Sequence, residues 1–122
     1  MPWQLPAFQA YTGKNPPRFA NEVELECAKL LDFYGVPWDY EPRTFVLEQD
    51  PEGRITSAFT PDFYLPEQDM YVECTTMRQS LTARKNRKLR KLREQGVLVT
   101  VLYRRDFERL RERHGFPFDA AA

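Results

Sequence analysis

The sequence predicts an α/β fold in which a mixed four-stranded sheet is flanked by helices, in the chain order α-β-β-β-α-β-α. Three observations predict it: apolar residues recur at helical spacing in two stretches, strand-forming residues fill the region between them, and an apolar stretch follows the second helix. With 122 residues, 42% of them hydrophobic, the chain suits one packed domain. We expect this domain over residues 19–118, after an arm over residues 1–18 in which prolines block regular structure.

Three helices are predicted, and a glycine directly after each supplies the usual C-terminal stop. They are expected at residues 21–34, 77–95 and 106–114, before Gly35, Gly96 and Gly115. Thr76 and Gln79 have the spacing of a capping box at the start of the second helix.

Four strands are predicted, with turns rich in proline or glycine between the first three. They are expected at residues 38–47, 55–65, 70–75 and 97–103. In the third strand, Val72 and Cys74 should face one side of the sheet and Glu73 the other. The fourth strand is nearly all apolar, which is typical of a strand buried on both faces.

The composition limits the chemistry. The two cysteines, Cys27 and Cys74, do not form a zinc site without further ligands, so we expect buried thiols. The one histidine, His114, argues against a Ser-His-Asp triad. Hydrolytic chemistry would therefore depend on carboxylates, lysines and a metal ion. Because no apolar run has the length of a membrane helix and the first residues lack a signal-peptide pattern, we expect a cytoplasmic protein without a membrane partner.

The net charge of zero conceals a strong asymmetry. Residues 78–93 contain eight Lys or Arg and no acid, and the remainder of the chain carries the compensating acids. Such a run is often only a solvated helix face, but it also suits a phosphate backbone. The candidate nucleic-acid contacts are Arg78, Arg84, Arg87, Lys88 and Lys91.

Two acids have the spacing of a metal site. Asp62 lies late in the second predicted strand and Glu73 lies within the third, and a short turn joins the two strands. Paired antiparallel strands can bring two such side chains together. An acid inside a strand is costly to bury unless it is paired or binds a metal ion. Converging carboxylates are the ligands that Mg²⁺ needs for phosphodiester hydrolysis.

The segment from Phe19 to about Leu110 resembles the PD-(D/E)xK nuclease superfamily, especially its small stand-alone members akin to very-short-patch, transposon-end and phage-resolvase endonucleases. The matching pieces are Glu24, Trp38-Asp39-Tyr40-Glu41-Pro42, Thr60-Pro61-Asp62-Phe63-Tyr64-Leu65-Pro66, Tyr71-Val72-Glu73 and Leu102-Tyr103. The resemblance implies a restriction-endonuclease-like core, with Asp62 and Glu73 as ligands of Mg²⁺ or Mn²⁺. It also implies that Glu24 completes the site.

One departure from the family pattern concerns its lysine. The pattern has lysine two residues after the strand acid, where this sequence has Thr75. On a helical projection of the second helix, Lys85 and Lys88 lie inside the apolar stripe, where a charged group needs a partner. The stripe itself contains Met77, Leu81, Leu89 and Leu92. We expect Lys85, the nearer of the two to the strand, to replace the missing lysine.

Structural roles compete with these assignments. Glu24 stands three residues after Asn21 and also suits a capping box. Glu41 is either a surface acid or part of the active site. Asp62 also suits a solvated acid beside a turn, and Glu73 a structural ion pair with a lysine of the second helix.

Two functions follow from these features. The first is a metal-dependent DNA endonuclease with Asp62, Glu73, Glu24 and Lys85 as catalytic residues. The second is an inactive nuclease-fold module that binds nucleic acid, which the missing lysine favours and the two retained acids oppose. A domain of this size covers little DNA, so a homodimer that makes two cuts is also compatible with the sequence.

Overall fold

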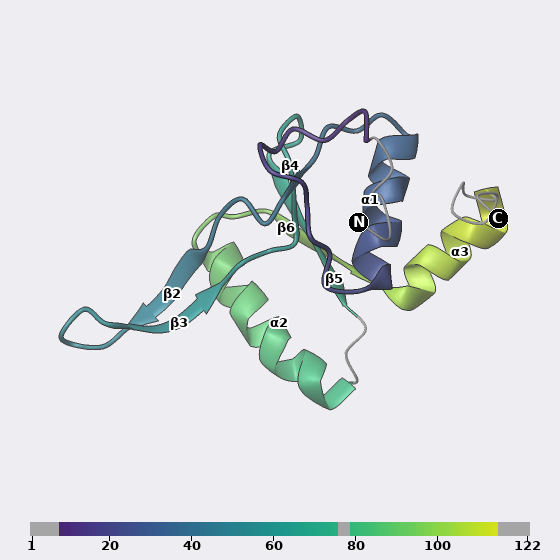
Figure 1. The fold of residues 1–122 in the computed structure, drawn as a ribbon. Helices are drawn as coiled ribbons and strands as arrows, with labels where there is room; N and C mark the ends of the chain where they lie inside the picture. Colours follow the sequence, from purple (N-terminus) through teal and green to yellow (C-terminus); the bar gives the residue numbers. More distant parts are fainter. Residues whose placement is uncertain (1–7, 76–78, 115–122) are drawn as a thin grey trace.

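A four-stranded sheet lies between two layers of helices in the computed structural model, which describes residues 8–75 and 79–114 (Figure 1). The elements follow the order α1 (Glu22–Phe33), β1 (Asp39–Tyr40), β2 (Phe45–Gln49), β3 (Ile55–Phe59), β4 (Phe63–Leu65), β5 (Met70–Thr75), α2 (Gln79–Glu94), β6 (Val99–Tyr103) and α3 (Arg104–His114). None of the helices in the described ranges combines the length and apolar content that a membrane span requires.

The sheet is mixed, as predicted, with the strand order β1-β4-β5-β6. β4 runs antiparallel to β1 and to β5, whereas β5 and β6 are parallel. Parallel neighbours require a crossover connection, and α2 provides it. The α/β class and the mixed four-stranded sheet with helices are therefore confirmed, whereas the chain order differs from the prediction because five strands precede α2 in the described residues.

Two predicted strands were wrong because each is divided into two. Residues 38–47 form β1 and β2, and residues 55–65 form β3 and β4. Glu41 has a φ of 46°, which ends β1, and Pro61 has no N–H with which to continue a ladder. β2 and β3 pair only with each other in the described structure and form a hairpin that extends beyond the main sheet (Figure 1). Asp62 therefore precedes β4 directly instead of lying late in a long strand.

The last strand is also less buried than predicted. β6 starts at Val99, and the side chain of Leu98 before it is 57% exposed. β6 lies at one edge of the sheet and its Thr100 is exposed. The apolar sequence of this strand therefore does not bury it on both faces, contrary to the prediction. The final helix starts at Arg104, two residues earlier than expected.

The first helix is close to its prediction. The side chain of Asn21 caps it by accepting a hydrogen bond from the backbone N–H of Glu24 at 3.0 Å. Gly35, with a φ of 66°, follows its last turn as a glycine stop does. The predicted capping box of the second helix lies partly outside the described residues, as do Met77 and the side chain of Leu81.

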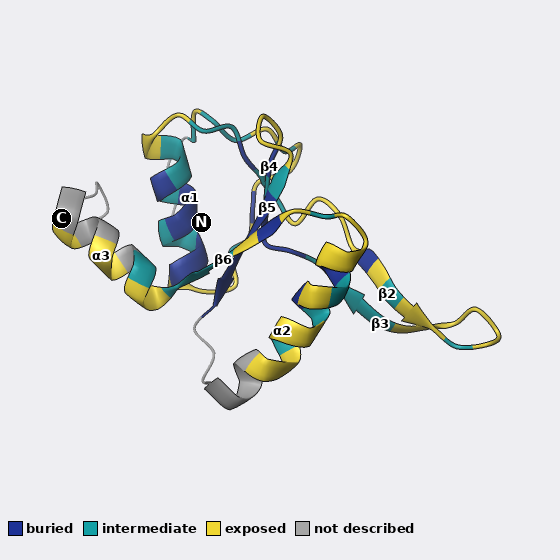
Figure 2. Ribbon diagram, turned by 180° about the vertical axis from the view of Figure 1, so that it is seen from behind, coloured by how far each residue is buried: buried dark blue, intermediate teal, exposed yellow. Residues whose placement is uncertain are grey.

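β5 is buried along most of its length (Figure 2), and its two faces belong to two apolar clusters. Val72 and Cys74 pack with buried residues of α1 and with Trp38, whereas Tyr71 packs with Leu89 and Leu92 of α2. This alternation, which the sequence predicted, buries both faces of β5. Polar side chains in this strand are therefore removed from solvent.

The described part of the N-terminal arm packs on the domain. The rings of Phe8 and Tyr11 lie 5.1 and 4.6 Å from the ring of Trp38, measured between centroids. The backbone N–H of Thr12 donates to the carbonyl oxygen of Trp38 at 2.7 Å. The N–H of Trp38 in turn donates to the carbonyl oxygen of Ala10 at 3.0 Å. The described part of the arm thus covers the apolar cluster around Trp38.

Candidate metal and phosphodiester site

Asp62 and Glu73 lie side by side across the β4–β5 pair. Phe63 is opposite Val72 in the antiparallel ladder. Asp62, just before Phe63, is therefore a neighbour of Glu73, just after Val72. The backbone N–H of Asp62 donates to Oε1 of Glu73 at 2.9 Å, and the N–H of Cys74 donates to Oδ2 of Asp62 at 2.9 Å. Asp62 and Glu73 are only 6% and 3% exposed. The fold therefore places two buried carboxylates at one point.

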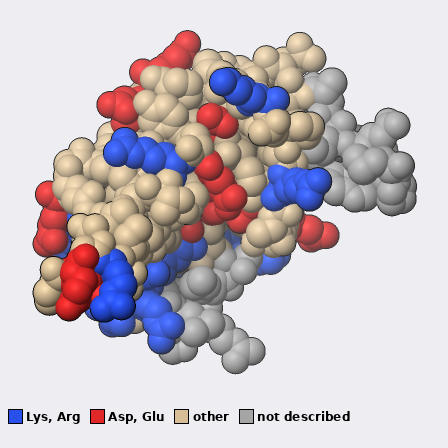
Figure 3. Space-filling model, turned by 60° about the vertical axis from the view of Figure 1, so that its left-hand side comes forward, with Lys and Arg blue, Asp and Glu red and all other residues tan. Residues whose placement is uncertain are grey.

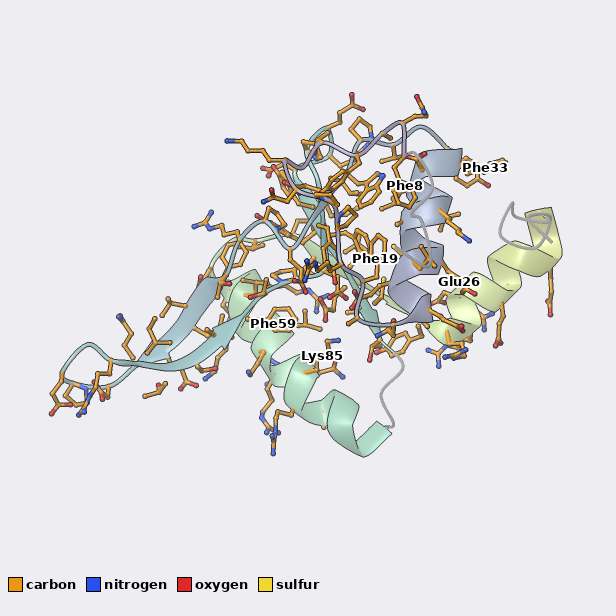
Figure 4. The ribbon with its side chains drawn as sticks, viewed as in Figure 1. Phe8, Phe19, Glu26, Phe33, Phe59 and Lys85 are labelled. Atoms are coloured by element: carbon orange, nitrogen blue, oxygen red, sulfur yellow. The ribbon has the colours of Figure 1, made fainter. Side chains whose placement is uncertain are left out.

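The ammonium of Lys85 reaches this pair from α2, on the side of the helix that faces the sheet (Figure 4). Its Nζ lies 2.5 Å from Oε2 of Glu73 and 3.3 Å from the carbonyl oxygen of Cys74. The Lys85 side chain is 12% exposed. The lysine thus occupies the position expected from the apolar stripe. The same contact is also compatible with the alternative role of Glu73, a structural ion pair with a lysine of the second helix.

Thr75 occupies the position where the family pattern has lysine. It is buried at the end of β5, opposite Tyr103 in the ladder. Its side chain carries no charge, so the positive charge beside Glu73 comes from the following helix.

The two acids are poorly solvated and repel each other. Burial, and next the charge of Glu73, raise the pKa of Asp62 to about 8, whereas the Cys74 N–H and the charge of Lys85 oppose this shift. Burial also raises the pKa of Glu73, and its contact with Lys85 opposes that change. One ammonium therefore accompanies two carboxylates, which leaves the site with excess negative charge when both acids are ionised.

Glu24 lies in the first turn of α1 and connects three segments. Its Oε1 accepts hydrogen bonds from the backbone N–H of Ala20 at 3.0 Å and from the hydroxyl of Tyr40 at 2.5 Å. The side chain is buried, and its charge contributes to the raised pKa of Asp62. Its carboxylate does not bond the N–H of Asn21 as a reciprocal capping box would, so Asn21 alone caps the helix.

Glu41 lies at the edge of this region. Its side chain is exposed, while its backbone N–H donates to the carbonyl oxygen of Asp62 at 2.7 Å. Partial burial, and next the charge of Glu24, raise the pKa of Glu41. The structure therefore connects Glu41 to the site through its backbone.

A three-ligand metal cluster is not assembled in the described structure. Within residues 8–75 and 79–114, no three His, Cys, Asp or Glu side chains lie close enough together to hold one metal ion. Glu24 thus stays outside the pair formed by Asp62 and Glu73. The side chain of His114 lies outside the described residues, and both cysteines are buried and free, as predicted.

The basic side chains of α2 gather beside the β2–β3 hairpin. Of the predicted nucleic-acid contacts, Arg84, Arg87, Lys88 and Lys91 line one pocket of about 220 Å³, and Arg78 lies outside the described residues. Glu48 and Ser57 of the hairpin complete the lining. Sequence reasoning missed these two because no local pattern shows that the hairpin packs against α2.

The Tyr40 hydroxyl should hold Glu24 in place. Replacing Tyr40 by Phe should lower the free energy of unfolding by about 1.5 kcal/mol, because a hydrogen bond to a buried charged group is lost. Tyr64→Phe is a matched control, since the Tyr64 hydroxyl also donates to a carboxylate, that of Asp69, but in an exposed position. Urea denaturation of the two variants measures the difference, and equal small losses would contradict a structural role for the Tyr40 contact.

The functional assignment depends on the geometry of these residues. Comparison of the chain with protein-family models, with curated proteins and with solved structures finds no significant match in any of the three.

Proposed function

We propose that the protein is a metal-dependent DNA endonuclease with a restriction-endonuclease-like core, which hydrolyses phosphodiester bonds. The observation that supports this function best is the buried pair of carboxylates, Asp62 and Glu73, in contact with the single ammonium of Lys85. A structural ion pair requires one acid for one lysine. When both acids are ionised, the second adds a negative charge that the described residues leave unbalanced, and such an arrangement is costly unless it has a functional partner.

A divalent cation suits this excess charge. Mg²⁺ binds through one or two carboxylates and keeps several of its waters, so two acids without a third ligand are compatible with it. Asp62 and Glu73 would hold the ion, and Glu24 would act from outside this pair. When bound, the ion would activate water and neutralise charge on the phosphate.

The protein side chains have separate tasks in this proposal. The backbone N–H groups of Asp62 and Cys74 fix the orientation of both carboxylates. Lys85 stabilises the negative charge that develops on the phosphate oxygens, as a lysine from the strand would in the family pattern. Exclusion of water around these buried groups strengthens their electrostatic interactions.

The substrate in this proposal is DNA, bound through α2. Several Lys and Arg side chains gather in the lower part of the face in Figure 3, while other basic side chains and the acidic ones are spread over the rest of it. Phosphate contacts by such cations release counter-ions and make the affinity depend on salt.

The competing function is an inactive nuclease-fold module that binds nucleic acid. Two observations favour it: Thr75 replaces the usual lysine, and the contact between Lys85 and Glu73 satisfies both groups without a metal ion. Both functions include binding to the phosphate backbone, so only a cleavage assay separates them.

Supercoiled plasmid should be nicked or linearised by the full chain with Mg²⁺ or Mn²⁺ and left intact with EDTA. Glu73→Gln, purified in the same way, should cut at least about 100-fold more slowly, because it removes one ligand charge and the partner of Lys85. Gel electrophoresis over time measures the rates. Equal cutting by the two proteins would point to a contaminant, and binding without any cleavage would establish the inactive module.

A further inference from the structure

The pocket between α2 and the β2–β3 hairpin has the composition of an anion site. Four cations line it, from Arg84 to Lys91, together with one carboxylate, from Glu48, and the hydroxyl of Ser57. Its volume of about 220 Å³ suits a small group instead of a drug-sized ligand, for which about 300 Å³ or more is usual. The cations come from the helix, and the carboxylate and hydroxyl come from the hairpin.

The four cations differ in their partners. Arg84 and Arg87 are exposed, and neither has an ion-pair partner among the described residues. Lys88 donates to the carbonyl oxygen of Ala58 at 3.2 Å, which leaves its charge without a carboxylate. Lys91 alone has one, because its Nζ lies 2.6 Å from Oε1 of Glu48. The pocket therefore holds one internal anion and an excess of positive charge.

We propose that this pocket binds one backbone phosphate of a DNA strand, and that Glu48 is an internal counter-ion which the phosphate displaces from Lys91. The inference rests on the proposed function, since it assigns the phosphate to DNA. Arg84, Arg87 and Lys88 attract the phosphate, and the Ser57 hydroxyl donates a hydrogen bond to it. Glu48 and Lys91 are partly exposed, with side chains 51% and 39% accessible, so their contact can open without unfolding the protein.

The position of the pocket connects it to the carboxylate site. Lys85 and Lys91 are six residues apart on α2, which corresponds to about 9 Å along the helix axis. Each nucleotide advances about 3.4 Å along a strand of duplex DNA. Where a DNA strand follows α2, this axial spacing corresponds to about three nucleotides between the bound phosphate and the bond beside Lys85, and the hairpin becomes part of the DNA interface.

Binding of a labelled DNA duplex to the full chain in EDTA tests this inference without cleavage. Glu48→Gln should raise the affinity about fivefold, because the phosphate no longer competes with a carboxylate. The slope of log affinity against log salt should also become steeper by up to about one unit. Ser57→Ala should weaken binding about threefold. Glu52→Gln is the matched control, since it removes the same charge at the tip of the hairpin, 3.5 Å from Arg54 and outside the pocket lining.

The outcomes distinguish a local site from a general charge effect. Equal gains for Glu48→Gln and Glu52→Gln would overturn the inference, and so would unchanged affinity in Glu48→Gln. A pocket that binds inorganic phosphate while DNA affinity is the same in all variants would overturn the assignment to DNA. If Glu48→Gln tightens DNA binding but the parent protein never cleaves DNA with Mg²⁺, the phosphate pocket stands and the nuclease proposal fails.

Discussion

Replacing Asp62 by Asn should abolish DNA cleavage and, in the absence of metal, make the protein more stable at alkaline pH. The loss of one ligand charge should slow cleavage by about 1,000-fold or more. Stability should rise because Asn keeps the shape of the side chain and still accepts the hydrogen bond from the Cys74 N–H, but carries no buried charge. The expected gain above pH 8 is on the order of 2 kcal/mol.

The pH dependence follows from the raised pKa of Asp62. Between its ordinary value of 3.8 and the folded value of about 8, the folded protein keeps a proton that the unfolded chain releases. The stability that this group contributes is therefore complete below pH 3.8. It decreases as the pH rises above 3.8 and is lost once the pH has risen through about 8. Asn does not titrate, so the two proteins should differ little at pH 4 and most at pH 9.

Urea denaturation in EDTA at both pH values measures this difference. Asp69→Asn is a suitable control, because it makes the same change at an exposed carboxylate. Addition of Mg²⁺ at pH 9 should stabilise the parent protein and leave Asp62→Asn unchanged, because only the parent keeps both carboxylates. A destabilised Asp62→Asn protein at pH 9 would show that the charged form of Asp62 is well compensated without metal.

Replacing Lys85 by Ala should lower the rate of DNA cleavage by about 1,000-fold, because a positive charge beside the reacting phosphate is lost. DNA affinity in EDTA should change little, since the ammonium is turned toward Glu73 and is largely buried. The variant should also lose about 3 kcal/mol of stability near pH 8, because Glu73 is left buried without its partner.

A second substitution separates the two effects of Lys85. Glu73→Gln in the Lys85→Ala background should restore most of the lost stability, since neither charge then remains, while cleavage stays absent. Lys88→Ala is the control for stability alone, because Lys88 contacts a backbone carbonyl and neither carboxylate, whereas its loss should weaken DNA binding. If Lys85→Ala cleaves DNA at the rate of the parent, Lys85 does not stabilise the charge on the phosphate, and either Lys88 or no lysine has that role.

The parts of the site that sequence reasoning predicted depend on local periodicity. β5 has the bounds expected from its alternating residues, and its ladder with β4 places Glu73 beside Asp62. Lys85 was predicted because a lysine inside an apolar stripe must find a partner, and Glu73 is that partner.

The parts that the sequence did not predict depend on contacts between distant segments. Residues 55–65 are divided at Pro61, and the two halves join different sheets. Hydrophobic alternation along the sequence is the same for one long strand and for two short ones, so it does not predict the division. The approach of Glu48 to Lys91 joins residues more than forty positions apart, and no helical or strand period contains that information. The position of Glu24 beside Tyr40 is a tertiary contact of the same kind.

The hydrogen bonds that hold Asp62 and Glu73 have an evolutionary consequence. The donors are backbone N–H groups, that of Asp62 for Glu73 and that of Cys74 for Asp62, so substitution of one acid removes a charge but leaves the donor to the other acid in place. If catalysis needs both acids, the first substitution already removes the function and a second costs little more, which is positive epistasis. A lineage that gave up one acid would face little selection to keep the other. The two positions are therefore expected to be retained together or lost together.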